Sequence, residues 1–250
     1  EGGPPGRAGE VAGAGDVHVQ RVGECCQRAT CDTRSVANIL CLDFDGIIVP
    51  GDIARRIFDR FAEPGWDELE SRKMRGELTP EQFRAATLGL VESEKAELAE
   101  FVAAVALPRP GLAGVLGLAQ WQGWVPMVVS PGFDFYVDPV LDVMGMDRLA
   151  RHVGRTRRDY RWRVRYESPR GVELEDGFVL SYLSALRNAG DFVVYASVDE
   201  DAAIAAAAAS MVFAGGGLLK RLEGAHERVH PFEGFEELWR VIESECPAGG

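Results

Sequence analysis

A continuous apolar run near the start of the chain ends in two aspartates. The stretch VANILCLDF, residues 36–44, is apolar at nearly every position rather than at alternate positions. A strand of a parallel sheet has this pattern because helices cover both of its faces. We therefore expect a central parallel strand with Asp43 and Asp45 at its carboxyl end and Gly46 directly behind them. The alternative is a strand closed by an ordinary polar turn, since Asp and Gly are common turn residues.

Further apolar runs follow, and helical patterns separate them. The runs VPMVVS, DFVVYAS and MVFAG predict short strands over residues 125–130, 191–197 and 211–215, and RWRVRYES predicts an exposed strand over 161–168. Apolar spacing predicts helices over 52–61, 78–91, 94–107, 111–124, 133–145, 177–190, 199–210 and 231–244. One of these helices has a clear start, with Thr79 as N-cap, Pro80 at the first position and Gln82 completing a capping box. Strands that alternate with helices indicate an α/β fold with a parallel sheet and helices on both faces.

The helical stretch between the first two strands is too long for a single crossover. We expect residues 53–107 to form a small helical cap, and residues 36–52 and 108–250 to form the core domain. Residues 1–35 are poor in aromatic residues and rich in Gly, Pro, Arg and Ala, so we expect a disordered leader there.

Charge and hydropathy narrow the function classes. The formal net charge is −12 and the pI is about 4.9, so the sequence offers no basic surface for nucleic acid. No apolar run reaches the roughly 18 residues that cross a bilayer. No secretory signal is visible, so we predict a cytoplasmic protein without a membrane partner. The sequence does not indicate an oligomeric state.

Polar residues stand at three predicted strand ends, where open parallel sheets bind their ligands. These residues are Asp43 and Asp45, Ser130, and the stretch 197–201. Neighbouring carboxylates suit a hard cation such as Mg²⁺. A carboxylate can also attack phosphorus to form an aspartyl-phosphate, while a neighbouring carboxyl group protonates the leaving alcohol. Ser130 precedes a predicted helix start, where a hydroxyl and free amides can hold phosphate oxygens.

Three segments resemble motifs of the haloacid dehalogenase (HAD) superfamily: LCLDFDGIIV, MVVSPGFDFYVDPVL and DFVVYASVDEDAAIAAAAASMVFA. The sequence is similar to the phosphoserine-phosphatase-like group, which includes methionine-salvage phosphatases, from about residue 36 to about residue 243. The resemblance implies a HAD-like Rossmannoid sheet with a helical cap inserted after the first strand. It implies a Mg²⁺-dependent phosphatase of a small phosphorylated metabolite. By the same resemblance, Asp43 is the nucleophile, Asp45 is the general acid and base, and Ser130 binds the phosphate. We also predict Gly132 as a substrate-binding residue, and Asp43, Asp45, Asp199 and Asp201 as metal ligands.

The sequence also departs from the pattern of this family. Ile47 replaces a threonine, and Pro131, which has no N–H, replaces a glycine after the serine. The lysine that the family places before its fourth strand is absent, and Val179 stands near its expected position. Counting back from MVFA without gaps puts Val198 and Ala202 where the family has its metal-binding aspartates; a shift of one residue puts Ser197 and Asp201 there.

Two functions therefore remain open from the sequence. The first is a Mg²⁺-dependent phosphatase that acts through Asp43 and Asp45. The second is a catalytically degenerate relative that binds a phosphorylated metabolite or a protein partner. Individual residues also have structural alternatives: Ser130 can cap a helix, and Asp199 and Asp201 can interact with a helix dipole in its first turn.

Overall fold

The computed structural model describes residues 36–246, so the leader predicted for residues 1–35 lies outside the described residues. One sheet of eight strands organises this part of the chain, in the order β5-β4-β3-β2-β1-β6-β7-β8. The strands are β1 Asn38–Leu42, β2 Val125–Phe133, β3 Ala150–Arg158, β4 Trp162–Glu167, β5 Glu173–Leu174, β6 Phe192–Ser197, β7 Met211–Ala214 and β8 Val229–Pro231.

The sheet is parallel from β3 to β8, and only β4 and β5 at one edge run antiparallel to their neighbours. The chain leaves β1 for β2 on one side and later returns to β6 on the other side. The order of the strands therefore reverses at β1, which is where open α/β sheets form their ligand crevice. This arrangement confirms the predicted α/β class with a mostly parallel sheet.

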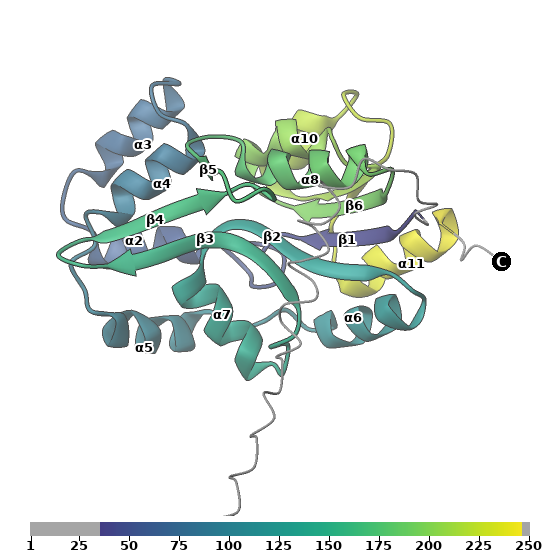
Figure 1. The fold of residues 1–250 in the computed structure, drawn as a ribbon, viewed down its shortest axis with the longest axis horizontal. Coiled ribbons are helices and arrows are strands. Elements are labelled where there is room, and N and C mark those ends of the chain that lie inside the picture. The colour runs from purple at the N-terminus through teal and green to yellow at the C-terminus, as the bar shows by residue number, and fades with distance from the viewer. Residues whose placement is uncertain (1–35, 247–250) are drawn as a thin grey trace, which may run out of the picture.

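Helices cover both faces of the sheet (Figure 1). Figure 1 shows α6, α7 and α11 along the lower side of the sheet and α8 and α10 along the upper side. The helices are α2 Ile53–Phe61, α3 Trp66–Met74, α4 Pro80–Leu88, α5 Lys95–Val105, α6 Leu112–Trp121, α7 Asp134–Val143, α8 Phe178–Asn188, α9 Ala203–Ala206, α10 Gly216–Leu222 and α11 Phe235–Glu245, with a 3₁₀ turn η1 at Glu200–Ala202.

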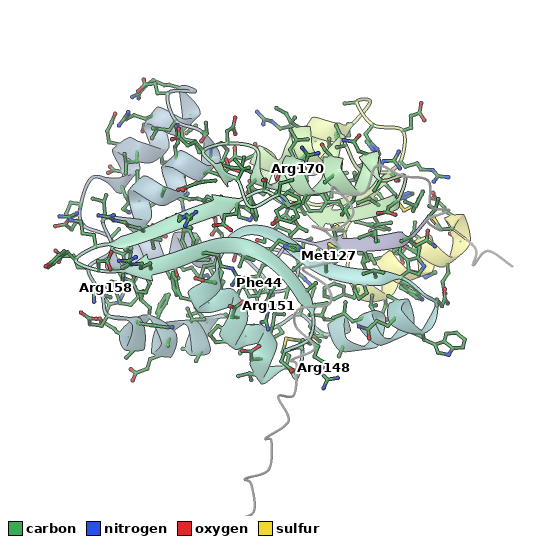
Figure 2. The ribbon with its side chains drawn as sticks, in the orientation of Figure 1. Phe44, Met127, Arg148, Arg151, Arg158 and Arg170 are labelled. Carbon is green, nitrogen blue, oxygen red and sulfur yellow. The ribbon has the colours of Figure 1, made fainter. Side chains whose placement is uncertain are left out.

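The core lies between these layers. Leu40, Cys41 and Leu42 of β1 are fully buried, as the continuous apolar run predicted. Figure 2 places Phe44 and Met127 near the centre of the molecule, and both are buried. The Phe44 ring lies 5.6 Å from the ring of Tyr136, so the loop after β1 is fixed against α7. The position of Asp43, between Leu42 and Phe44, is therefore set by packing on both sides.

Helices α2 to α5 occupy the segment between β1 and β2. They lie at the left end of the sheet in Figure 1, and α4 packs against β4 while α5 packs against α7. The Thr79 hydroxyl accepts a hydrogen bond from the Gln82 N–H at 3.1 Å, and the Gln82 side chain accepts one from the Thr79 N–H at 3.1 Å. These bonds form the predicted capping box at the start of α4. The division of the chain into a core domain and a cap over residues 53–107 stays a prediction.

The strand predicted over residues 161–168 is present as β4, between β3 and the short β5. The structure corrects two local expectations. The alanine-rich stretch 199–210 forms only η1 and the short α9 before β7 begins. Strand β2 continues past Ser130 to Phe133, so α7 begins at Asp134 and Ser130 is not its cap.

No helix within residues 36–246 has both the length and the apolar character to cross a bilayer.

The contact between α4 and the core generates a stability prediction. Besides its role in the capping box, the Thr79 hydroxyl donates a hydrogen bond to the Glu175 carbonyl ahead of α8. We expect Thr79→Ala to lower the free energy of unfolding by about 1–2 kcal/mol, because it removes the cap and this bond together. Urea unfolding followed by circular dichroism measures the change. Thr79→Ser keeps the hydroxyl, so its free energy of unfolding should fall much less. Equal stability of the Ala and Ser variants would contradict the role of the Thr79 hydroxyl.

Candidate active site

A cavity of about 510 Å³ opens at the carboxyl ends of β1, β2 and β6. Its floor contains Asp43, Asp45 and Ser130. Its walls come from α3 and α4 on one side, and from the loop after β6 and α10 on the other. In Figure 1, α3 and α4 lie at the upper left and α10 at the upper right. Residues far apart in the sequence thus meet at the switch point of the sheet.

Asp43 is almost completely buried at the tip of β1. Its carboxylate accepts hydrogen bonds from the Ser197 hydroxyl at 2.6 Å and from the Phe44 N–H at 2.8 Å. Burial, together with the nearby charge of Asp199, raises the pKa of Asp43 to about 6, although the hydroxyls of Ser130 and Ser197 lower it. Asp43 is therefore ionised at neutral pH, with hydroxyl groups from both neighbouring strands beside it.

Asp45 is also held by two hydrogen bonds. One carboxylate oxygen accepts a hydrogen bond from the Ile53 N–H at 2.8 Å, and the other accepts one from the Tyr136 hydroxyl at 2.7 Å. Burial first, and the charge of Asp52 second, raise the pKa of Asp45 to about 8, against the opposing effect of Arg84. Asp45 is therefore the weaker acid of the two carboxyl groups and holds a proton more readily than Asp43. Neighbouring carboxyl groups whose pKa values differ in this way suit a division into nucleophile and general acid.

Ser130 lies inside β2 and is buried, and its hydroxyl faces the same cavity as Asp43. The Gly132 N–H donates a hydrogen bond to the Ser130 hydroxyl at 3.2 Å. A Cβ at Gly132 would approach the Tyr136 hydroxyl to 2.7 Å, so only glycine fits beneath that ring. Gly132 thus positions Ser130 and Tyr136 in the structure; contact of its own amide with a substrate stays a prediction.

Asp199 and Asp201 line the opposite wall, and each pairs with a cation from the helices after β1. Arg84 of α4 contacts Asp199 at 3.3 Å, and Lys73 of α3 contacts Asp201 at 2.6 Å. Burial alone would lower the pKa of Arg84, but the nearby carboxylates, Asp199 foremost, hold it well above its ordinary value. Two ion pairs therefore connect α3 and α4 to the loop after β6 across the cavity.

The four predicted metal ligands all line this cavity, but the structure does not gather their carboxylates around one point. Within residues 36–246, no three carboxyl, imidazole or thiol side chains are grouped at metal-ligand spacing. Asp43 and Asp199 remain close neighbours, because the Ser197 hydroxyl that donates to Asp43 also accepts from the Asp199 N–H at 3.1 Å. This pair fits Mg²⁺, which uses one or two carboxylates and completes its shell with water and substrate phosphate. The four-ligand set stays a prediction.

Sequence reasoning missed three residues that the fold brings into the site. The sequence marks Ser197 as part of a strand end and as one alignment for a family aspartate, but it does not predict the short hydrogen bond from its hydroxyl to Asp43. Arg84 and Lys73 belong to helical patterns whose sequence gives no sign that they reach the ends of the strands. Val179, near the place expected for the family lysine, is a buried apolar residue on α8. The start of that helix is instead capped by Glu81, which accepts from the Phe178 N–H at 2.8 Å.

Comparison with known proteins agrees with this geometry. A region of 105 residues is 30% identical to 2-hydroxy-3-keto-5-methylthiopentenyl-1-phosphate phosphatase of Geobacillus thermodenitrificans, and it covers 42% of this chain and 48% of that protein. The bifunctional enzyme MtnB/MtnX of Bacillus licheniformis is 26% identical over 82% of this chain and 49% of its own length. The chain thus spans about half the length of each of these relatives.

Solved structures share the fold. A substrate-bound phosphoserine phosphatase superposes with a TM-score of 0.61 at 16% identity, over 83% of this chain and 99% of that chain. Residues 40–178 match the family described as haloacid dehalogenase-like hydrolase. The matched region runs from β1 through the helices that follow it and includes the strand with Ser130. With the aspartates at the switch point and the matching fold, the chain belongs to the haloacid dehalogenase-like hydrolase family.

Proposed function

We propose that this protein is a phosphatase that hydrolyses a small phosphomonoester through an aspartyl-phosphate at Asp43. The observation that carries the proposal is that Asp43, Asp45 and Ser130 line one cavity, where Asp45 has the higher pKa of the two carboxyl groups. The names of the relatives support the choice of phosphate esters, and they suggest an enol phosphate of the methionine-salvage type as the first substrate to test.

The proposed reaction has two steps. An oxygen of the Asp43 carboxylate attacks phosphorus, the bond between phosphorus and the ester oxygen breaks, and Asp45 gives its proton to the leaving alcohol. Water then attacks the phosphorus of the aspartyl-phosphate, Asp45 takes up a proton from that water, and phosphate leaves with Asp43 restored. The Ser130 hydroxyl donates a hydrogen bond to a phosphoryl oxygen during both steps.

Mg²⁺ is part of this proposal. Asp43 and Asp199 are the residues that would hold it, and it would supply positive charge beside the phosphoryl group when bound.

A second candidate function remains, because specific contacts favour it. Both oxygens of Asp45 are engaged, Asp199 and Asp201 are paired with cations, and an apolar side chain occupies position 179. A degenerate relative that binds a phosphorylated metabolite or a protein partner without turnover would have such a site.

An activity assay separates the two functions. With Mg²⁺, we expect the full chain to release phosphate from at least one member of a panel that includes phosphoserine and the methionine-salvage enol phosphate. Asp43→Asn should lower the rate by at least about 10³-fold, because it removes the attacking oxygen. Asp59→Asn, which changes an exposed carboxylate on α2, is the matched control. Equal background release by the unmodified chain and Asp43→Asn would reject the phosphatase and leave the binding function.

The protonation of Asp45 has its own thermodynamic test. A carboxyl group whose pKa is raised from 3.8 to about 8 by folding stabilises the native state most when it is protonated. In EDTA, we therefore expect the free energy of unfolding to fall as pH rises from 6 to 8, by up to about 1.4 kcal/mol per pH unit. Asp43, with a pKa of about 6, contributes to the pH dependence of the free energy of unfolding mainly below pH 6.

Urea titrations at several pH values measure this slope. Asp45→Asn cannot ionise and should flatten it, whereas Asp59→Asn should keep the slope of the unmodified chain. The same slope in Asp45→Asn and in the unmodified chain would show that Asp45 is not the titrating group.

A further inference from the structure

In the part of the chain that the structure describes, none of the cations that line the cavity belongs to a strand, yet a phosphoryl group carries negative charge over several oxygens. Phosphoryl transfer depends on positioned positive charge around that group. Within the described residues, the cations that line the cavity are Lys73, Arg84 and Arg221. Their environments differ enough to distinguish them.

Lys73 and Arg221 are poorly placed to receive a ligand. The Lys73 ammonium contacts Asp201 at 2.6 Å and lies 5.3 Å from the centre of the Phe83 ring, so it is held between an anion and an aromatic face. Arg221 lies on α10, is exposed, and donates to the Glu200 carbonyl at 3.2 Å. Charge at an exposed position is strongly screened by water.

Arg84 is different because its charge is enclosed. Its side chain is only 12% exposed, and a charge in such a place acts more strongly on its neighbours than a charge in water. Among the described residues, its one hydrogen bond runs from Nη2 to Asp199 at 3.3 Å, although a guanidinium has five N–H donors. The side chain therefore has donors to offer to a ligand in the cavity that it lines.

Arg84 also faces the groups of the proposed reaction. Arg84 lines the same cavity as Asp43, Asp45 and Ser130, and its positive charge is one of the influences that lower the pKa of Asp45. Its partner Asp199 acts on Asp43 from the neighbouring position. A phosphate over Asp43 and Ser130 would thus lie between the floor of the cavity and the Arg84 side chain.

We propose that Arg84, from the helix α4, is a phosphate-binding residue of this site and supplies the positive charge that no residue of α8 provides. The planar fork of its guanidinium can donate two parallel hydrogen bonds to phosphate oxygens. The inference rests on the proposed site at Asp43 and Ser130, but it does not require turnover. It assigns a binding role to α4, because Arg84 lines the cavity from this helix and would donate to the anion.

The test is the binding of inorganic phosphate to the full chain in EDTA, measured by isothermal titration calorimetry at fixed ionic strength. Because EDTA removes metal ions, a change in phosphate affinity cannot come from the loss of a metal bound by Asp199. We expect Arg84→Met to weaken phosphate binding by about 10- to 100-fold. Arg84→Lys should recover part of the affinity, since an ammonium keeps the charge but not the fork. Arg60→Met removes an exposed cation from α2 and should bind phosphate as the unmodified chain does.

A double variant separates the loss of Arg84 from the effect of leaving Asp199 unpaired. Arg84→Met leaves Asp199 without its partner, and the free carboxylate could repel phosphate by itself. In Arg84→Met/Asp199→Asn this repulsion is absent, and we expect binding to stay weak. Full recovery of affinity in the double variant, or unchanged affinity in Arg84→Met, would overturn the role of Arg84. Thermal melts check that each variant is folded.

The result is also separable from the proposed function. If the unmodified chain hydrolyses phosphate esters but Arg84→Met binds phosphate normally, the phosphatase stands and the inference about Arg84 falls. If the chain shows no hydrolysis but Arg84→Met abolishes its phosphate binding, the inference stands and the phosphatase falls. Absence of phosphate binding by the unmodified chain would overturn the inference about Arg84.

Discussion

The burial of one carboxylate at the reversal point of the sheet is the constraint on which the site depends. Asp43 is placed there by the apolar residues on either side of it, and its desolvation is unfavourable unless polar groups compensate. The Ser197 hydroxyl at 2.6 Å and the Phe44 N–H at 2.8 Å provide that compensation. Because Ser197 ends β6, the same bond that stabilises Asp43 also fixes the neighbouring strand end and the acidic loop behind it.

The second constraint is the balance of charge around that carboxylate. Asp43, Asp45, Asp199 and Asp201 line one cavity, and so many carboxylates cannot all be ionised without opposing charge. The fold answers this in two ways. Burial raises the pKa of Asp45 and so favours its neutral form, and Arg84 and Lys73 pair with Asp199 and Asp201. The helices after β1 are therefore part of the electrostatics of the site as well as its cover.

The sequence predicted the parts of this design that depend on local patterns. The apolar run identified β1 and put Asp43 and Asp45 at its end, and Thr79 and Gln82 identified the start of α4. The prediction was wrong about the end of the second strand: β2 runs on through Pro131 to Phe133 instead of ending at Ser130. The contacts of Ser197 with Asp43 and of Arg84 with Asp199 span 154 and 115 positions, and no local pattern encodes such pairs. The binding and catalytic roles of these residues stay predictions, because they concern ligands and reactions rather than packing.

The absent lysine shows why the electrostatic potential in a site describes its chemistry better than a sequence motif does. A phosphoryl group responds to the potential at its oxygens, whichever element supplies the charge. Position 179 on α8 holds a buried valine, and Glu81 of α4 occupies the start of that helix instead. One turn further along α4, Arg84 lines the cavity and contacts Asp199 at 3.3 Å. A positive charge supplied by α4 instead of the core would make anion binding depend on the packing of α4 against the core.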